Sequence, residues 1–133
     1  MSVVHNPPAA MKPAGAYSQG IEVRPGGRLL FISGQVGVDN AGRCGIGILE
    51  QSQLAWANLG AVLDSAGMKP QNVVKITTFY ARELQLNDAM RIAVNDIRIR
   101  FFGAHRPAST AFYVDRLMKP EWLVEIEAVA IEG

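Results

Sequence analysis

The feature that most constrains the fold is the C-terminal run WLVEIEAVAIE, which predicts a strand over residues 122–131. Because successive side chains of a strand point to opposite faces, this run has two different surfaces. One surface is wholly apolar and suits packing against helices, since it carries Val124, Ile126, Ala128 and Ala130. The other surface combines two carboxylates, Glu125 and Glu127, with Leu123 and Val129. A solvated surface is seldom so apolar, so the second surface also needs a cover.

The rest of the chain divides into short segments with clear periodicity. Apolar residues recur at spacings of three and four in two segments, each followed by a glycine that can end a helix, Gly67 or Gly103. Runs of β-branched and aromatic residues predict strands. In chain order, the predicted elements are an extended arm (1–13), a hairpin (21–23 and 28–33) turning at Pro25-Gly26-Gly27, a glycine-rich loop (33–47), a helix (48–66), a strand (73–80), a helix (87–102) and the two last strands (109–115 and 122–131).

This order predicts an α+β fold in which two helices cover one face of a mixed β-sheet. At 133 residues the chain is expected to form one domain over residues 1–133. On the strand 73–80, Val73, Lys75, Thr77 and Phe79 repeat the mixture of polar and apolar residues seen beside Glu125. Nothing remains in the chain to cover that face, so a second copy of the chain is expected to do so.

Composition and charge exclude several functional classes. Thirteen basic and twelve acidic residues leave a net charge of +1, which provides no general attraction for nucleic acid or an anionic membrane. Cys44 is the only cysteine, and with two histidines a zinc site or other metal site is not expected. The N-terminus lacks the apolar core of a signal peptide. We therefore expect a cytoplasmic protein without metal or other cofactor.

Glu125 and Glu127 are the residues most suited to acid–base chemistry. Two residues apart on one strand, they lie about 7 Å from each other on the same face. If that face is covered, the pKa of at least one carboxyl is raised, as a general acid or base requires. The alternative is that one or both carboxylates pair with lysine or arginine on neighbouring strands.

Six ordered motifs resemble the Rid family, the RidA/YjgF group of reactive-intermediate imine and enamine deaminases once labelled L-PSP endoribonucleases. They are AGAYSQG (14–20), FISGQVG (31–37), VVKITTFY (73–80), VNDIRIRFF (94–102), RPAST (106–110) and VEIEAVA (124–130). The resemblance extends from about Pro13 to Ile131. It implies a chorismate-mutase-like fold, a homotrimer with ligand clefts between subunits, and cofactor-free hydrolysis of enamines or imines to carbonyl compounds and ammonia.

The resemblance also assigns roles to individual residues. It implies that Glu125 orients the attacking water as the catalytic residue. It implies that Tyr17, Ser33, Gly34 and Asn95 bind the substrate, together with the two small residues of the RPAST motif, Ser109 and Thr110. The deaminases of this family hold the substrate carboxylate with an arginine where this chain has Ser109. Two arginines are candidates to take its place: Arg98, which replaces a common family tyrosine and shares the helix face of Asn95, and Arg106, three residues before Ser109.

Two functions remain open from the sequence. The first is a deaminase for an imine or enamine other than 2-aminoacrylate, with Glu125 activating water. The second is a non-catalytic trimeric protein that binds a small metabolite in the same cleft, a reading that the missing arginine favours. The near-neutral charge and the lack of a histidine pair or stacking aromatics disfavour a ribonuclease.

Overall fold

Four strands form the central sheet in the order β3-β6-β4-β5. Their bounds are Arg28–Val36 for β3, Val73–Ala81 for β4, Ala108–Val114 for β5 and Val124–Glu132 for β6. The β4–β5 pair is parallel and the other pairs are antiparallel, so the sheet is mixed as predicted. The computed structural model describes residues 2–13, 15–24 and 26–133.

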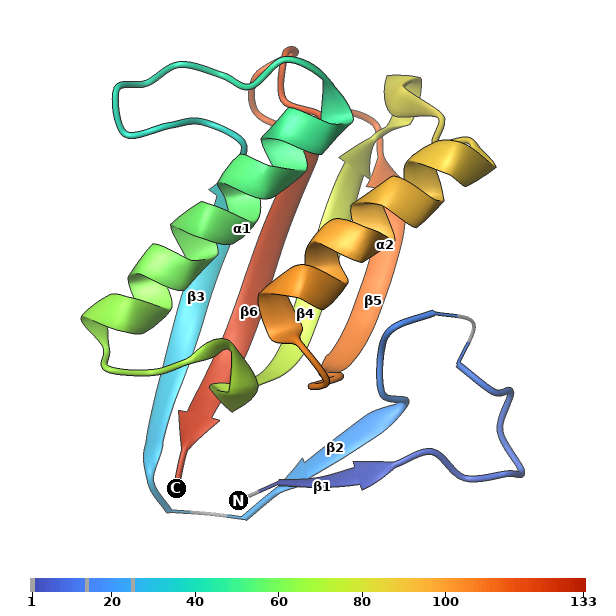
Figure 1. Ribbon diagram of the computed structural model, residues 1–133, viewed down its shortest axis with the longest axis vertical. Helices are drawn as coiled ribbons and strands as arrows, with labels where there is room; N and C mark the ends of the chain where they lie inside the picture. Colours follow the sequence, from blue (N-terminus) through green and yellow to red (C-terminus); the bar gives the residue numbers. More distant parts are fainter. Residues whose placement is uncertain (1, 14, 25) are drawn as a thin grey trace.

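Both long helices lie on the same face of this sheet (Figure 1). Helix α1 spans Gly47–Ser65 and lies over β3 and β6. Helix α2 spans Asp88–Phe102 and lies over β4 and β5. Two short 3-10 turns, η1 (Pro70–Asn72) and η2 (Arg82–Leu84), bracket β4. The predicted α+β layer architecture, with two helices on one face of a mixed sheet, is confirmed.

The ends of the helices follow from local chemistry. The Asn87 side chain accepts a hydrogen bond from the Met90 amide at 2.8 Å and so caps the start of α2. Gly67 and Gly103 have φ values of +69° and +63°, a backbone region that favours glycine, and they end α1 and α2 as predicted. None of the helices in the described part of the chain is long and apolar enough to cross a membrane.

The core lies between the sheet and the two helices. The apolar face of β6 is buried under them as predicted, and Ala130 is fully inaccessible. On the helix side, Trp56 of α1 packs on Phe101 and Phe102 of α2, with ring centroids 4.9 and 5.3 Å apart. These rings join α1 to α2, and the pair of helices then presents one apolar surface to the sheet.

The predicted hairpin of residues 21–23 and 28–33 is wrong. Strand β2 (Gly20–Val23) pairs instead with β1 (Ser2–His5), and the two form a separate small sheet below the main one (Figure 1). Strand β3 pairs with β6, because the long apolar β6 offers β3 a far more extensive partner than the short β2 does. The predicted extended arm therefore contains a strand, and Pro25 of the predicted turn lies outside the described residues.

The predicted face of β4 is correct for Lys75, Thr77 and Phe79 but not for Val73. A register shift between Val73 and Lys75 turns Val73 to the helix side, where its side chain is inaccessible to solvent. Such a bulge inserts one residue and so inverts the alternation on one side of it.

The face of the sheet opposite the helices, called the open face below, is uncovered in the single chain. It carries exposed apolar side chains from several elements: Phe31 is 73% exposed, and Leu29 and Phe112 are about half exposed. Phe31 pairs with Val129 of β6 in the sheet register. The exposed apolar surface that the C-terminal alternation predicted is therefore present.

Candidate active site

Glu125 lies on the open face near the start of β6. In the sheet register its neighbours are Val36 of β3 and Phe79 of β4. The carboxylate folds over Gly34, at a register shift in β3, so closely that a methyl group at position 34 would clash with it. Ser33, beside Gly34, is exposed, and its carbonyl accepts a hydrogen bond from Gln35 Nε2 at 3.1 Å. The structure thus brings together Glu125, Ser33 and Gly34, three of the predicted site residues.

Two amides on α1 fix the strands that flank Glu125. Gln51 is buried; its Nε2 donates to the Glu121 carbonyl at 3.0 Å and its Oε1 accepts from the Leu123 amide at 2.8 Å, just before β6. Asn58 Nδ2 donates to the carbonyl of Val36 at 2.9 Å. Sequence reasoning did not assign these roles. The available signal was that these two amides fall among the apolar residues of the side of α1 that faces the sheet, because amides removed from water need specific partners.

The surroundings of Glu125 favour its protonated form. Burial raises the pKa of the Glu125 carboxyl, and the charge of Glu127 raises it further. The carboxyl lines a pocket of about 440 Å³ on the open face. The other residues that line this pocket are Phe79, Val114, Arg116, Leu117, Met118 and Glu127. A carboxylate with a raised pKa in a largely apolar pocket is suited to accept and return a proton.

Two of the predicted residues, Ser109 and Thr110, belong to β5 and lie on its opposite faces. Thr110 pairs with Thr77 on the open face and accepts a hydrogen bond from Lys75 Nζ at 2.7 Å. Ser109 pairs with Ile76, a buried residue of the helix side, and so points the opposite way. The two side chains therefore lie on opposite faces of the sheet.

On the helix side, α2 and the β5 edge line two further pockets. Asn95 of α2 lies in one of them, of about 170 Å³, together with Arg98 and Tyr80. The half-buried Tyr17 belongs to the segment that runs along the start of β5, where the Ser18 amide donates to the Pro107 carbonyl at 3.0 Å.

The predicted site therefore divides into two halves on opposite sides of the sheet. Glu125 and Gly34 belong to the open face, whereas Asn95 and Ser109 belong to the helix side. A single chain does not bring these halves together. Arg106 joins neither half, because its guanidinium donates to the carbonyls of Gly103 and His105 at 2.6 and 3.0 Å.

No cluster of three or more histidine, cysteine or acidic side chains occurs in the described ranges, so they assemble no recognisable metal site. The side chains of the site supply two sets of functional groups. These are a proton-accepting carboxylate on the open face, and amide, phenol and guanidinium groups on the helix side.

Fold and pocket together define the class: a small α+β protein with two helices on one face of a mixed sheet and, on the other face, a pocket lined by a carboxyl with a raised pKa. The family model described as Endoribonuclease L-PSP matches residues 7–132. The chain belongs to this family, the L-PSP or Rid family, as the sequence motifs predicted.

Three relatives illustrate the range of similarity. A 2-iminobutanoate/2-iminopropanoate deaminase of Capra hircus is 39% identical over 128 residues, covering 95% of this chain and 85% of the relative. A RutC family protein of Pyrococcus abyssi is 37% identical over 123 residues, covering 91% and 90%. The crystal structure of the Rid family protein YyfB from Yersinia pestis, described as of unknown function, matches with a TM-score of 0.85 at 34% identity, covering 98% of each chain.

Gly34→Ala is expected to displace the Glu125 carboxylate. The backbone at position 34 tolerates alanine, but the added methyl group takes the space of the carboxylate, which rotates away. We expect the melting temperature to change little and any Glu125-dependent activity to fall at least tenfold, as for other misplaced catalytic groups. Gly20→Ala is the matched control, because its methyl group would meet His5 Cβ at an ordinary 3.7 Å. Equal activity of the two variants would show that the carboxylate needs no fixed position.

Proposed function

We propose that this protein is a cofactor-free hydrolase that converts a small imine or enamine into a carbonyl compound and ammonia. The observation that carries the proposal is the Glu125 carboxyl, held over Gly34 in a largely apolar pocket with its pKa raised. Several relatives, 38–39% identical to this chain, are named 2-iminobutanoate/2-iminopropanoate deaminase. The Glu125 carboxyl supports acid–base chemistry, and the names of these relatives support an imine as the substrate.

The proposed active site is a cleft between two copies in a homotrimer. The open face, with Phe31 73% exposed and Met118 82% exposed, packs against the α2–β5 edge of the next copy. This arrangement covers the apolar face and brings the Glu125 half of one chain to the Asn95 half of another. The division of the site residues between two faces supports it, since the residues could not otherwise act together.

In the proposed reaction, water attacks the imine carbon while Glu125 accepts one proton from that water. A C–O bond forms, and the electron pair of the C=N bond moves to nitrogen, which takes up a proton. Glu125 then returns its proton to the nitrogen, the C–N bond breaks and ammonia leaves. The hydroxyl group gives its proton to solvent as the carbonyl forms, which balances the proton that the nitrogen took up from solvent. An enamine first takes a proton on carbon to give the imine. Tyr17 and Asn95 hold the nitrogen and its substituents by hydrogen bonds.

The test is ammonia release from imines generated in place by an amino-acid-consuming enzyme. We expect the protein to accelerate release well above the spontaneous rate on at least one imine of the panel. A trimer that binds the corresponding keto acid but gives no acceleration would refute the deaminase and support the metabolite-binding alternative, which the serine at position 109 favours.

Glu127→Gln is expected to move the acidic limb of the pH profile to lower pH. The base form of Glu125 exists only above its pKa, and the Glu127 charge is one of the two causes that raise it. Removing this charge lowers the pKa, so kcat/KM begins to rise at a more acidic pH. Glu132→Gln is the control, since it removes the same charge from the far end of β6, where Glu132 pairs with Arg28. An unmoved limb in Glu127→Gln would mean that Glu125 is not the titrating base.

A further inference from the structure

The pockets between α2 and β5 are cationic and contain no acid. The first is lined by Tyr80, Leu86, Arg91, Val94, Asn95 and Arg98. The second shares Tyr80, Leu86 and Arg91 with it and adds Ala111, Phe112 and Tyr113. Two arginines therefore line this adjoining space without a carboxylate among the lining residues. Such a composition attracts an anion.

Arg98 has no protein counterion within the described ranges. The ion pairs there involve Arg28, Arg43, Arg82 and His5, but not Arg98. Its Nε atom is buried and donates no hydrogen bond. The Tyr80 hydroxyl lies beside the guanidinium and stays neutral, because burial raises the pKa of that phenol. A charge in this state lacks the compensation that buried charges ordinarily have, so a ligand that supplies a negative charge is favoured.

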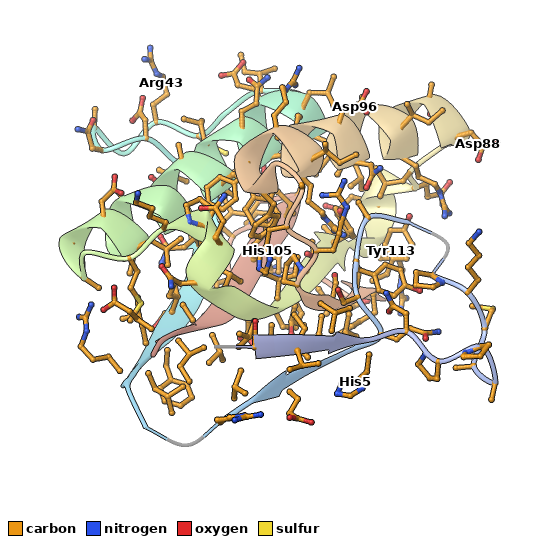
Figure 2. All side chains as sticks on the ribbon, turned by 60° about the horizontal axis from the view of Figure 1, so that its bottom comes forward. His5, Arg43, Asp88, Asp96, His105 and Tyr113 are labelled. Atoms are coloured by element: carbon orange, nitrogen blue, oxygen red, sulfur yellow. The ribbon has the colours of Figure 1, made fainter. Side chains whose placement is uncertain are left out.

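The acidic residues of α2 do not provide this charge. Figure 2 shows Asp96 on the side of the helix that points away from the sheet and Asp88 at the end of the helix, while Tyr113 lies on the sheet side. Asp88 and Asp96 are both exposed. Burial lowers the pKa of the Arg98 guanidinium, yet an arginine stays protonated at neutral pH.

Arg98 is also placed to act together with Asn95. The two residues are three apart on α2, so their side chains lie on the same face of the helix. Across from them, the helix side of β5 presents the small residues Ser109 and Ala111, which leave room for a ligand. The guanidinium comes from the helix and can form two parallel hydrogen bonds to one carboxylate.

We propose that Arg98 binds the carboxylate of a 2-imino acid substrate. Helix α2 thereby supplies the contact to the anion, since β5 presents the uncharged Ser109 on this side of the sheet. This proposal rests on the proposed function for the identity of the substrate, but the anion contact itself is independent of turnover. It specifies the substrate class: an α-carboxylate, rather than a neutral imine.

The experiment measures binding of 2-oxobutanoate, the product expected from 2-iminobutanoate, by titration calorimetry. The proteins are the wild type, Glu125→Gln, Arg98→Leu, Arg98→Lys and Arg100→Leu; Arg100 is exposed on the same helix and outside both pockets. We expect Arg100→Leu to bind like the wild type, and Glu125→Gln, which no longer presents a carboxylate to the anion, to bind at least as tightly. Arg98→Leu is expected to bind about ten- to a hundredfold more weakly, and Arg98→Lys to lie between, because lysine keeps the charge but not the two-pronged contact.

A neutral probe and a direct signal complete the test. Butanone, which has the same carbon chain without the carboxylate, should bind the wild type and Arg98→Leu equally weakly. Should Arg98→Leu fail to fold, the Arg98 Nε–H signal of the arginine-labelled wild-type protein must still shift on addition of 2-oxobutanoate. Equal affinity of wild type and Arg98→Leu, or an unmoved Nε–H signal, would overturn the proposal. Intact Arg98-dependent binding without ammonia release would instead refute only the proposed hydrolysis.

Discussion

Glu125→Gln is expected to lower imine hydrolysis about a hundredfold or more while the assembly and the melting temperature persist. Glutamine retains the shape of the side chain but cannot accept a proton from the attacking water. Glu127 cannot take over, because it lies two residues further along β6, about 7 Å away. The measurement is the steady-state rate of ammonia release, corrected for the spontaneous rate at each imine concentration.

The matched control is Glu127→Gln, which removes a carboxylate from the same face and pocket. We expect it to keep turnover within a few fold at a pH where the Glu125 carboxyl is ionised in both proteins. Unchanged turnover in Glu125→Gln would exclude Glu125 as the base. Loss of the assembly in Glu125→Gln alone would show that the residue has a structural role.

The sequence predicted the layers of the fold because the relevant signals are local. The alternation of β6 separates an apolar face, including Val124 and Ile126, from the face of Glu125, and a strand fixes this separation whatever its partners are. The helices were equally predictable, since their apolar spacing and the stops at Gly67 and Gly103 need no tertiary information.

Strand pairing was less predictable because it depends on competition between distant partners. Residues 21–23 and 28–33 have the local pattern of a hairpin, yet β3 gains a longer apolar partner in β6. The register shift that turns Val73 toward the helices cannot be recognised from the order of polar and apolar residues in β4. Both differences arise from long-range pairing, which a window of residues does not contain.

The candidate site illustrates the same limit. Ser109 and Thr110 were both predicted to contact the ligand, and their adjacent places on one strand put their side chains on opposite faces of the sheet. The residue-by-residue resemblance gave their positions in the chain, whereas the sheet register showed that Glu125 and Ser109 lie on different faces. That Arg98 is buried without a counterion could not be predicted, because it depends on how α2 packs on β4 in three dimensions.

The central claim is that the site is completed between chains, and subunit mixing tests it. One parent carries Glu125→Gln and the other Asn95→Leu/Arg98→Leu, so each lacks one half of the site. Both parents are expected to be nearly inactive as pure assemblies. After joint unfolding and refolding in equal amounts, random assortment around a cyclic trimer leaves about a quarter of the interfaces with both halves intact.

The measurement is ammonia release by the refolded mixture, compared with each parent refolded alone and with the parents mixed without unfolding. We expect activity to recover to about a quarter of the wild-type value, because about a quarter of the interfaces are then complete. This recovery should occur only after the subunits have exchanged. A site contained within one chain stays defective in every subunit, whichever its neighbours are. No recovery in a mixture shown by mass spectrometry to contain mixed trimers would contradict the composite site.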